Sequence, residues 1–253
     1  MISVKNISFS YKTEQILDGV SLTLEKGELC SVIGVNGSGK TTLIRLMGGM
    51  LSPSKGVITL DGKDTRAYSQ KEYAQKISRL PQSRDIPSVL SADLIASGRY
   101  PYLGFSGRLS ENDVAAVNRA IELTDTAGLL NRPLRELSGG ERQRVYFAML
   151  LAQDTPYVLL DEPATHLDTP GRLELYRLIR MLKDSGKGVL SVSHDIAFAL
   201  KYSDKLLVLE NRSVAFYGDS KEDSAIHTIE RVLGVKSIKC TADGETEYFF
   251  KER

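Results

Sequence analysis

The chain has 253 residues with 33 basic and 32 acidic side chains, and its formal net charge is +1. This length suits one α/β domain with a sizeable core, while the balanced charge gives no surface typical of binding to nucleic acid or to an anionic membrane. The two cysteines, Cys30 and Cys240, lie far apart without metal-ligand spacing, which favours a reducing compartment.

The first 27 residues are predicted to form a β prelude. Ile7, Phe9 and Tyr11 alternate with polar residues, as do Val20, Leu22 and Leu24. This pattern predicts two antiparallel strands joined near residues 12–15. No apolar signal segment opens the chain, and no run approaches the roughly 20 apolar residues that span a bilayer. We therefore expect a cytoplasmic protein that reaches a membrane only through a partner.

A parallel α/β core is predicted next. Leu29–Ile33 is a short apolar run followed by a glycine-rich turn and a helix that begins near Lys40. Two more short apolar runs, Tyr157–Leu160 and Gly188–Ser193, are separated by an amphipathic helix over Gly171–Lys183. Buried strands that alternate with helices are typical of a parallel sheet flanked by helices. The segments assigned to this core are 28–91 and 154–218.

Residues 92–153 are predicted to be a helical subdomain inserted into the core, because they show helical periodicity and no convincing strand. Its three expected helices are Ala92–Ser97, Glu111–Thr124 and Glu141–Gln153.

Two further strands and a polar tail complete the predicted single domain. The strands are Lys205–Glu210 and Ser213–Tyr217. In the tail, 219–253, Cys240 and the pair Asp243-Gly244 indicate only a strand and a turn.

A glycine-rich loop joins the first core strand to its helix, and residues 34–41 match the pattern G-x-x-x-x-G-K-[ST]. Glycines let the backbone aim N–H groups at phosphate oxygens, Lys40 adds positive charge, and the Thr41 hydroxyl is a ligand for Mg²⁺. The alternative, a glycine-rich turn with a chance lysine, is disfavoured by the flanking strand and helix. The predicted nucleotide-binding residues of the loop are Gly34, Asn36, Gly37, Ser38, Gly39, Lys40, Thr41 and Thr42.

Two acidic residues, Asp161 and Glu162, follow the apolar run 157–160, at the strand end where open α/β sheets bind ligands. Asp161 is predicted to hold Mg²⁺, and Glu162 to activate the attacking water as a general base. The alternative is that two acids simply end a strand. Beside the phosphate loop, the pair predicts an enzyme that binds and hydrolyses ATP with Mg²⁺ as its cofactor.

Residues 137–144 read Leu-Ser-Gly-Gly-Glu-Arg-Gln-Arg and open a predicted helix. Ser138 can cap this helix, and Gly139 and Gly140 expose N–H groups, so the segment is a second surface for phosphate, although an ordinary helix cap is the alternative. With the other motifs in order, the segment resembles the LSGGQ-like signature of the ATP-binding-cassette (ABC) superfamily, with Glu141 in place of glutamine.

The resemblance covers nearly the whole chain through Tyr217. It implies an α/β P-loop ATPase core with a mixed, mostly parallel sheet, an antiparallel β subdomain and a helical insertion. It also implies a head-to-tail homodimer, in which Ser138, Gly139, Gly140 and Glu141 of one subunit cover the γ-phosphate that the other subunit binds.

Four other positions acquire roles from the same resemblance. Tyr11 stacks on adenine, where a half-buried strand tyrosine is the alternative. Gln82 is implied to reach Mg²⁺ and the water, and the alternative is an ordinary loop glutamine. His194 is implied to donate a hydrogen bond to the γ-phosphate, and the alternative is a structural histidine. Asp168, in the segment Thr165-His-Leu-Asp, contacts the opposite subunit.

Ala96–Gly104 reads Ala-Ser-Gly-Arg-Tyr-Pro-Tyr-Leu-Gly and resembles a segment of the ATPases of iron-siderophore, haem and cobalamin importers. A loop with an aromatic clamp is the alternative. The resemblance implies a subunit that powers import through ATP-driven dimer closure and reopening. Its implied partners are two integral-membrane permease subunits, which hold it on the inner face of the cell membrane, and indirectly an extracytoplasmic substrate-binding protein.

Two other functions stay open. One is a soluble ABC ATPase, for example in iron–sulfur cluster assembly, and the other is the ATPase of an importer for another substrate. A regulatory binder that holds ATP without turnover is disfavoured by Glu162 and His194.

Overall fold

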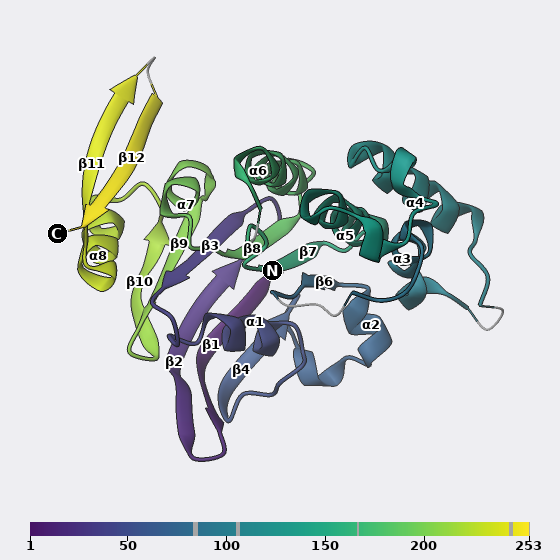
Figure 1. Cartoon of the computed structure of the whole chain (residues 1–253). Helices are drawn as coiled ribbons and strands as arrows, with labels where there is room; N and C mark the ends of the chain where they lie inside the picture. The colour runs from purple at the N-terminus through teal and green to yellow at the C-terminus, as the bar shows by residue number, and fades with distance from the viewer. Residues whose placement is uncertain (83–85, 105–106, 166, 243–244, 253) are drawn as a thin grey trace.

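The computed structural model describes residues 1–82, 86–104, 107–165, 167–242 and 245–252, and a six-stranded sheet runs through its centre (Figure 1). The strands lie in the order β10-β9-β3-β8-β7-β6, and all but β10 run parallel. Every residue of β3 is buried, as expected for a parallel strand with both faces covered. The strands are β3 (Leu29–Gly34), β6 (Ile77–Leu80), β7 (Tyr157–Asp161), β8 (Gly188–Val192), β9 (Lys205–Glu210) and β10 (Ser213–Asp219).

An antiparallel sheet packs beside the central one, in the order β2-β1-β4-β5. The predicted pair of N-terminal strands is confirmed, since β1 and β2 are antiparallel neighbours. β4 and β5 belong to this sheet although they lie within 28–91, the stretch assigned to the core. β4 joins because its residues pair with β1, a partner about 50 residues away that no local pattern specifies. The strands are β1 (Ile2–Tyr11), β2 (Glu14–Leu24), β4 (Lys55–Leu60) and β5 (Lys63–Asp64).

Helices cover both faces of the central sheet. On one face α1 (Lys40–Met47) buries Leu43, Ile44 and Met47 in a core that it shares with strands of both sheets. The opposite face carries α6 (Thr169–Asp184) and α7 (Ile196–Tyr202), whose apolar side chains pack on β7 and β8. The phosphate loop and the acidic pair therefore lie at strand ends that are held in a fully packed core.

The helical subdomain has a core of its own. Leu134, Val145 and Ala148 are among the residues that pack in it, and every helix of the subdomain contributes. The three predicted helices are present, and the last begins two residues earlier than expected, at Gly139. The helices are α3 (Ser91–Ser97), α4 (Glu111–Leu123) and α5 (Gly139–Gln153), with α2 (Gln70–Ala74) in the core beside them and 3₁₀ turns η1 (Thr65–Ala67), η2 (Tyr100–Tyr102), η3 (Ala127–Leu129) and η4 (Leu134–Glu136).

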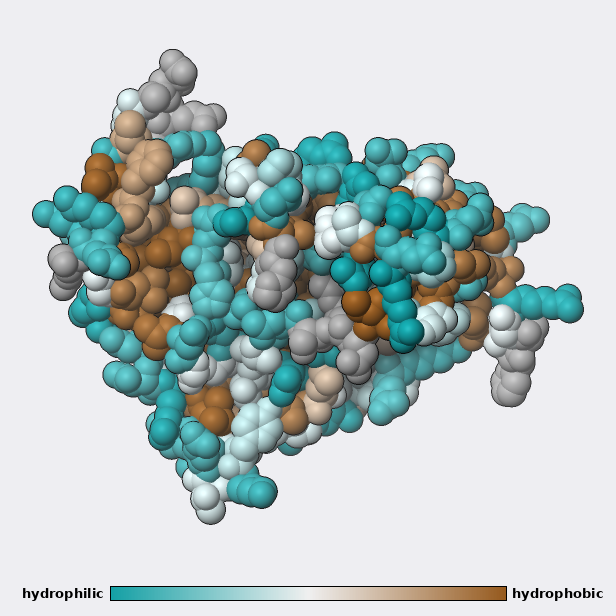
Figure 2. All heavy atoms as spheres, viewed as in Figure 1, coloured by the Kyte–Doolittle hydropathy of each residue, from teal (hydrophilic) through white to brown (hydrophobic). Residues whose placement is uncertain are grey.

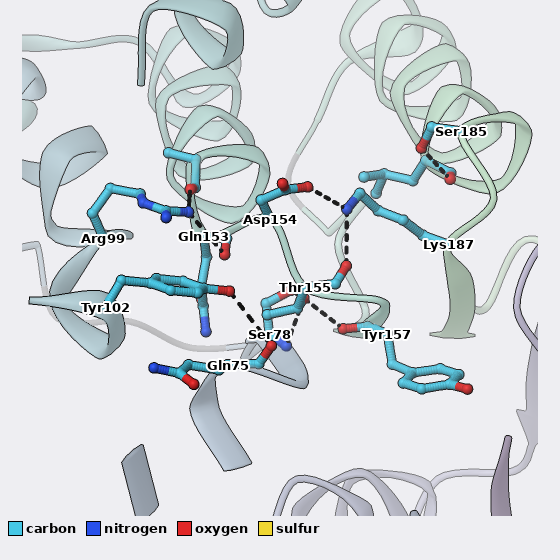
Figure 3. A network of polar contacts seen from close by, with 12 residues as sticks. Gln75, Ser78, Arg99, Tyr102, Gln153, Asp154, Thr155, Tyr157, Ser185 and Lys187 are labelled. Atoms are coloured by element: carbon cyan, nitrogen blue, oxygen red, sulfur yellow. Dashed lines mark hydrogen bonds and ion pairs between the residues drawn. The ribbon is translucent and has the colours of Figure 1, made fainter. Parts of the chain in front are cut away.

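The segment Ala96–Gly104 connects this subdomain to the core (Figure 3). The Arg99 side chain, 10% exposed, donates to Asp113 Oδ1 and to the carbonyl of Ala152, both at 2.8 Å. Its guanidinium lies 3.8 Å from the ring centroid of Tyr102, whose hydroxyl donates to the carbonyl of Gln75 in the core at 3.4 Å. The segment therefore links α4, the C-terminal end of α5 and Gln75, the residue after α2.

The C-terminal tail is more ordered than its polar composition predicts. α8 (Asp223–Leu233) buries four apolar residues against α7 and β9, and β11 (Val235–Ala242) and β12 (Glu245–Glu252) form an antiparallel hairpin that projects from the body (Figure 1). Apolar surface lies where the hairpin meets the body (Figure 2). Tyr248 and Phe250 of β12 pack against the same apolar cluster as α8. The predicted turn Asp243-Gly244 lies outside the described residues.

The layers match the predicted α/β class, with a mostly parallel sheet, an antiparallel subdomain and a helical insertion. Within the described ranges, no helix is both long enough and apolar enough to cross a membrane.

Candidate functional site

The glycine-rich loop lies between β3 and α1, and its glycines are required by its backbone. Gly37 and Gly39 have φ values of +80° and +99°. Residues with a Cβ atom rarely adopt this backbone conformation. A Cβ on Gly39 would lie 2.5 Å from Leu17 Cδ2, and one on Gly34 would lie 2.5 Å from the carbonyl oxygen of Leu209. The loop can therefore be wound this tightly only with glycine at these positions.

The Lys40 ammonium lies inside this loop. Its Nζ donates to the carbonyls of Gly34 at 2.8 Å and of Val35 at 3.0 Å, and the residue is 5% exposed. Burial lowers the pKa of Lys40, and the nearby Glu162 and Asp161 carboxylates oppose that shift. The result is a fixed positive charge surrounded by the loop's backbone, an environment suited to phosphate.

A cavity of about 510 Å³ opens on the loop. It brings together most of the predicted nucleotide and catalytic residues, which come from β2, the loop, α1 and the ends of β6, β7 and β8. Its lining is Ile16, Asn36, Gly37, Gly39, Lys40, Thr41, Thr42, Gln82, Glu162 and His194.

Ser38 lies behind the cavity lining. It is 4% exposed, and its hydroxyl oxygen has no hydrogen-bond partner among the described residues. A buried hydroxyl of this kind is a donor available to a ligand oxygen.

Thr41 and Asp161 form a pair of oxygen donors beside the cavity. The Thr41 hydroxyl donates to Asp161 Oδ1 at 3.3 Å. Burial raises the pKa of Asp161, the hydrogen bond from Thr41 opposes this, and the charge of Glu162 adds to it. One hydroxyl and one carboxylate fit Mg²⁺, which in nucleotide sites takes one or two protein oxygens and completes its shell with phosphates and water. In the described chain, no cluster of three or more His, Cys, Asp or Glu residues offers an all-protein metal site.

Glu162 is the residue on which the predicted catalytic groups converge. Gln82 Nε2 donates to its Oε2 at 2.6 Å, and His194 Nε2 lies 2.9 Å from its Oε1. Glu162 has a φ of +48°, a conformation that costs a non-glycine residue about 1–3 kcal/mol and that clusters at functional sites. Its side chain is 12% exposed and that of His194 is 53% exposed, so the carboxylate is shielded while the imidazole stands in the open.

Tyr11 is not among the residues that line the cavity. It lies at the end of β1, 40% exposed, where its hydroxyl accepts a hydrogen bond of 3.4 Å from Arg45 and its ring meets Phe9 edge-on. From the same β-hairpin, Ile16 lines the cavity instead. Sequence reasoning missed Ile16, because an isoleucine in a strand gives no signal that distinguishes it from a core residue.

The signature residues begin α5, away from this cavity. Ser138 is the N-cap of α5 and accepts the N–H of Glu141, whose carboxylate accepts the N–H of Ser138. Glu141 also pairs with Arg132 at 2.8 Å. Gly139 lines a separate hollow of about 200 Å³, which also includes Gln82. In the described part of the chain, no signature residue is among those that line the cavity at the phosphate loop, and Gln82 lines both hollows.

Asp168 caps α6. Its Oδ1 accepts the N–H of Gly171 at 3.0 Å, which fixes the end of the segment that follows Glu162. The neighbouring Thr165 donates to Glu162 Oε2 at 3.4 Å, a contact that the sequence did not reveal. His166, in the same predicted segment, lies outside the described residues.

The arrangement supports phosphoryl transfer to water. A backbone cradle with a buried ammonium suits a triphosphate, two oxygen donors suit a divalent cation, and a shielded carboxylate bonded to a glutamine and a histidine suits activation of water.

Comparison with known proteins agrees with this chemistry. Residues 17–165 match the family model described as ABC transporter. The petrobactin import ATP-binding protein YclP of Bacillus subtilis (strain 168) is 37% identical over 247 residues, which cover 97% of each chain. The iron(3+)-hydroxamate import ATP-binding protein FhuC of the same organism is 35% identical over 236 residues, covering 92% of this chain and 88% of its own.

A solved structure shares the fold. The dimeric structure of MJ0796, a bacterial ABC transporter cassette, superposes with a TM-score of 0.76 at 25% identity and covers 88% of this chain and all of its own. Motifs, fold and site geometry point the same way, and the family model spans more than half of the chain. The chain belongs to the ABC transporter family and is an ATP-binding, ATP-hydrolysing subunit of that family.

Proposed function

We propose that this chain powers an importer by hydrolysing ATP at two sites shared between two copies of itself. The observation that carries the proposal is the separation of two phosphate-binding surfaces on one chain, the loop cavity and the N-terminus of α5. A head-to-tail dimer would place the α5 surface of one copy over the cavity of the other. The dimeric state of the MJ0796 cassette supports this arrangement.

Each residue of the cavity has a proposed task. The loop backbone, Ser38 and Lys40 hold the phosphates, and Thr41, Asp161 and Gln82 hold Mg²⁺. The cation, when bound, neutralises charge on the phosphates. Tyr11 remains our proposal for adenine stacking, on the same hairpin as Ile16.

Glu162 is the proposed general base. Its carboxylate takes the proton of the attacking water, while Gln82 orients that water and His194 donates a hydrogen bond to the γ-phosphate. The observed bonds of Gln82 and His194 to Glu162 support this assignment, because they place all three polar groups within one small region.

The output of the site is motion of the two copies. In the proposed cycle, the γ-phosphate joins the cavity of one copy to Ser138, Gly139, Gly140 and Glu141 of the other, with Asp168 beside the interface. Hydrolysis removes that link, so the dimer reopens.

The proposed cargo is a ferric siderophore. The support is that YclP is named for petrobactin import and FhuC for iron(3+)-hydroxamate import. We propose two integral-membrane permease subunits as partners, which hold the chain at the cytoplasmic face of the membrane. An extracytoplasmic binding protein would deliver the cargo to those subunits.

Uptake into proteoliposomes tests the proposal. The chain is reconstituted with its permease subunits and binding protein, and ATP-dependent uptake of a ferric siderophore is compared with that of haem and cobalamin. We expect uptake of the siderophore alone, and none with Glu162→Gln. Uptake of haem or cobalamin instead would contradict the proposed cargo. ATPase activity that is the same with and without the permease would contradict the proposed role in an importer.

A further inference from the structure

A tyrosine of α6 is bonded to the residue next to His194. The Tyr176 hydroxyl donates a hydrogen bond of 2.5 Å to Oδ2 of Asp195. The other carboxylate oxygen of Asp195, Oδ1, accepts the N–H of Phe198 at 2.9 Å and so caps α7. Both oxygens of Asp195 therefore fix the turn that carries the histidine.

The same turn is tied to β3 and packed against aromatic rings. Ser193 Oγ accepts the N–H of Asp195 at 2.9 Å, and the N–H of Ser193 donates to the carbonyl of Val32 at 3.2 Å. The ring of Tyr176 stacks on that of Phe198, with centroids 3.9 Å apart and planes at 21°. Burial raises the pKa of Tyr176 and the bond to Asp195 adds to the shift, so the hydroxyl keeps its proton and remains a donor.

Packing does little to hold the imidazole of His194 itself. Its side chain is 53% exposed and borders the phosphate cavity on one side. On the other it borders a hollow of about 500 Å³ between α6, α7 and β12. The place of the imidazole therefore depends on its hydrogen bond with Glu162 and on its backbone, which Asp195 anchors.

We propose that Tyr176 and Asp195 are positioning residues that hold His194 at the γ-phosphate during hydrolysis. The inference rests on the role proposed for His194 above. α6 begins directly after Asp168, so the Tyr176–Asp195 bond also connects the segment proposed to touch the opposite subunit with the histidine turn. A displacement of Asp168 on contact with the opposite subunit would then be transmitted through α6 to the turn that carries His194.

Removal of one hydroxyl tests the inference. Tyr176→Phe keeps the ring on Phe198 and deletes the bond to Asp195. We expect kcat for ATP to fall about tenfold, the scale of a lost hydrogen bond to a charged group, while KM changes less than twofold. The matched control is Tyr202→Phe, because its ring lies 5.2 Å from that of Phe198 and its hydroxyl has no hydrogen bond within the described residues. This control should keep wild-type kcat.

A double-mutant cycle separates positioning from general stability. If Tyr176 acts through His194, adding Tyr176→Phe to His194→Ala should lower the single-turnover rate no further. Asp195→Asn retains an oxygen to cap α7 and offers an amide N–H₂ that can donate to the Tyr176 oxygen, so it should lower kcat less than Tyr176→Phe does. Wild-type kcat in Tyr176→Phe, or an equal loss in the His194→Ala background, would overturn the inference. Wild-type activity of His194→Ala itself would instead refute the role proposed for the histidine.

Discussion

Helices α1 and α5 both have a glycine at or just before their first residue, yet their first N–H groups meet different surroundings. Gly39, the N-cap of α1, has no side chain to offer the first turn. Ser138, the N-cap of α5, forms a reciprocal pair of hydrogen bonds with Glu141. The first N–H groups of α1 are thus left for a nucleotide that the same chain binds. The start of α5 is already capped by its own side chains and does not need a nucleotide from another copy to be stable.

The space around the two ends differs in the same sense. A Cβ on Gly39 would meet Leu17 at 2.5 Å, whereas one on Gly140 would meet nothing within 4 Å. An enclosed end suits a ligand gripped within one chain, and an open end suits a surface that closes on a second chain. The two ends are therefore complementary halves of one proposed site.

The largest expected effect comes from the base beside the enclosed end. Glu162→Gln should lower the rate of phosphate release about 100-fold to 10,000-fold, since it removes the general base. ATP binding should persist and trap a dimer, detectable by size-exclusion chromatography with ATP. Hydrolysis at the wild-type rate would exclude Glu162 as the base.

The next effect tests whether the two ends act in different copies. Ser138→Arg should abolish ATPase activity and leave ATP binding to the monomer intact, and Lys40→Ala should abolish binding. Mixing the two inactive variants creates heterodimers with one intact site, so activity should return to about a quarter of wild type. Failure of the mixture to regain activity, with heterodimers demonstrated by cross-linking, would contradict sites built from two copies.

A pair of matched alanine substitutions compares the two ends directly. Gly39→Ala should weaken ATP binding to the isolated monomer at least tenfold, because its φ of +99° and its neighbours leave no room for Cβ. Gly140→Ala should leave monomer folding and ATP binding unchanged but lower ATPase activity. Fluorescent-nucleotide titration and phosphate release measure the two quantities. Equal loss of ATP binding in both variants would contradict the proposed difference between the N-terminal ends of α1 and α5.

The smallest effect is expected at the cap of α5. Glu141→Gln should change ATPase activity less than twofold, because glutamine also completes a capping box. Hydrogen bonds from Ser138 lower the pKa of Glu141. The carboxylate therefore contributes stability above the ordinary glutamate pKa, and that contribution is lost as pH falls through the lowered value. Thermal melting should show a loss on acidification in the wild type that the variant lacks.

The sequence predicted those elements whose signals are local. β3, β7, β8 and β9 appeared within one or two residues of their observed bounds, since short apolar runs between turns specify buried strands. α8 was overlooked although Ala225, Ile226, Ile229 and Val232 have helical spacing, because the surrounding charges gave the tail a polar composition. The pairing of β4 with β1 depends on packing between distant segments.

The same division holds within the site. The phosphate loop, the acidic pair and the signature are contiguous and could be predicted as motifs. The Gln82–Glu162 and Tyr176–Asp195 hydrogen bonds join residues 80 and 19 positions apart, so only the folded chain reveals them. The roles of Tyr11, Asp168 and His194 remain predictions, and the His194→Ala variant described above addresses that of His194.

Lys40 has a consequence for how fast a nucleotide is captured. Its ammonium is already held by the carbonyls of Gly34 and Val35, in a loop whose glycine conformations are fixed. The Lys40 ammonium therefore does not have to change conformation when a nucleotide arrives. Capture should then be limited by diffusional encounter, and the association rate constant should decrease in proportion to solvent viscosity.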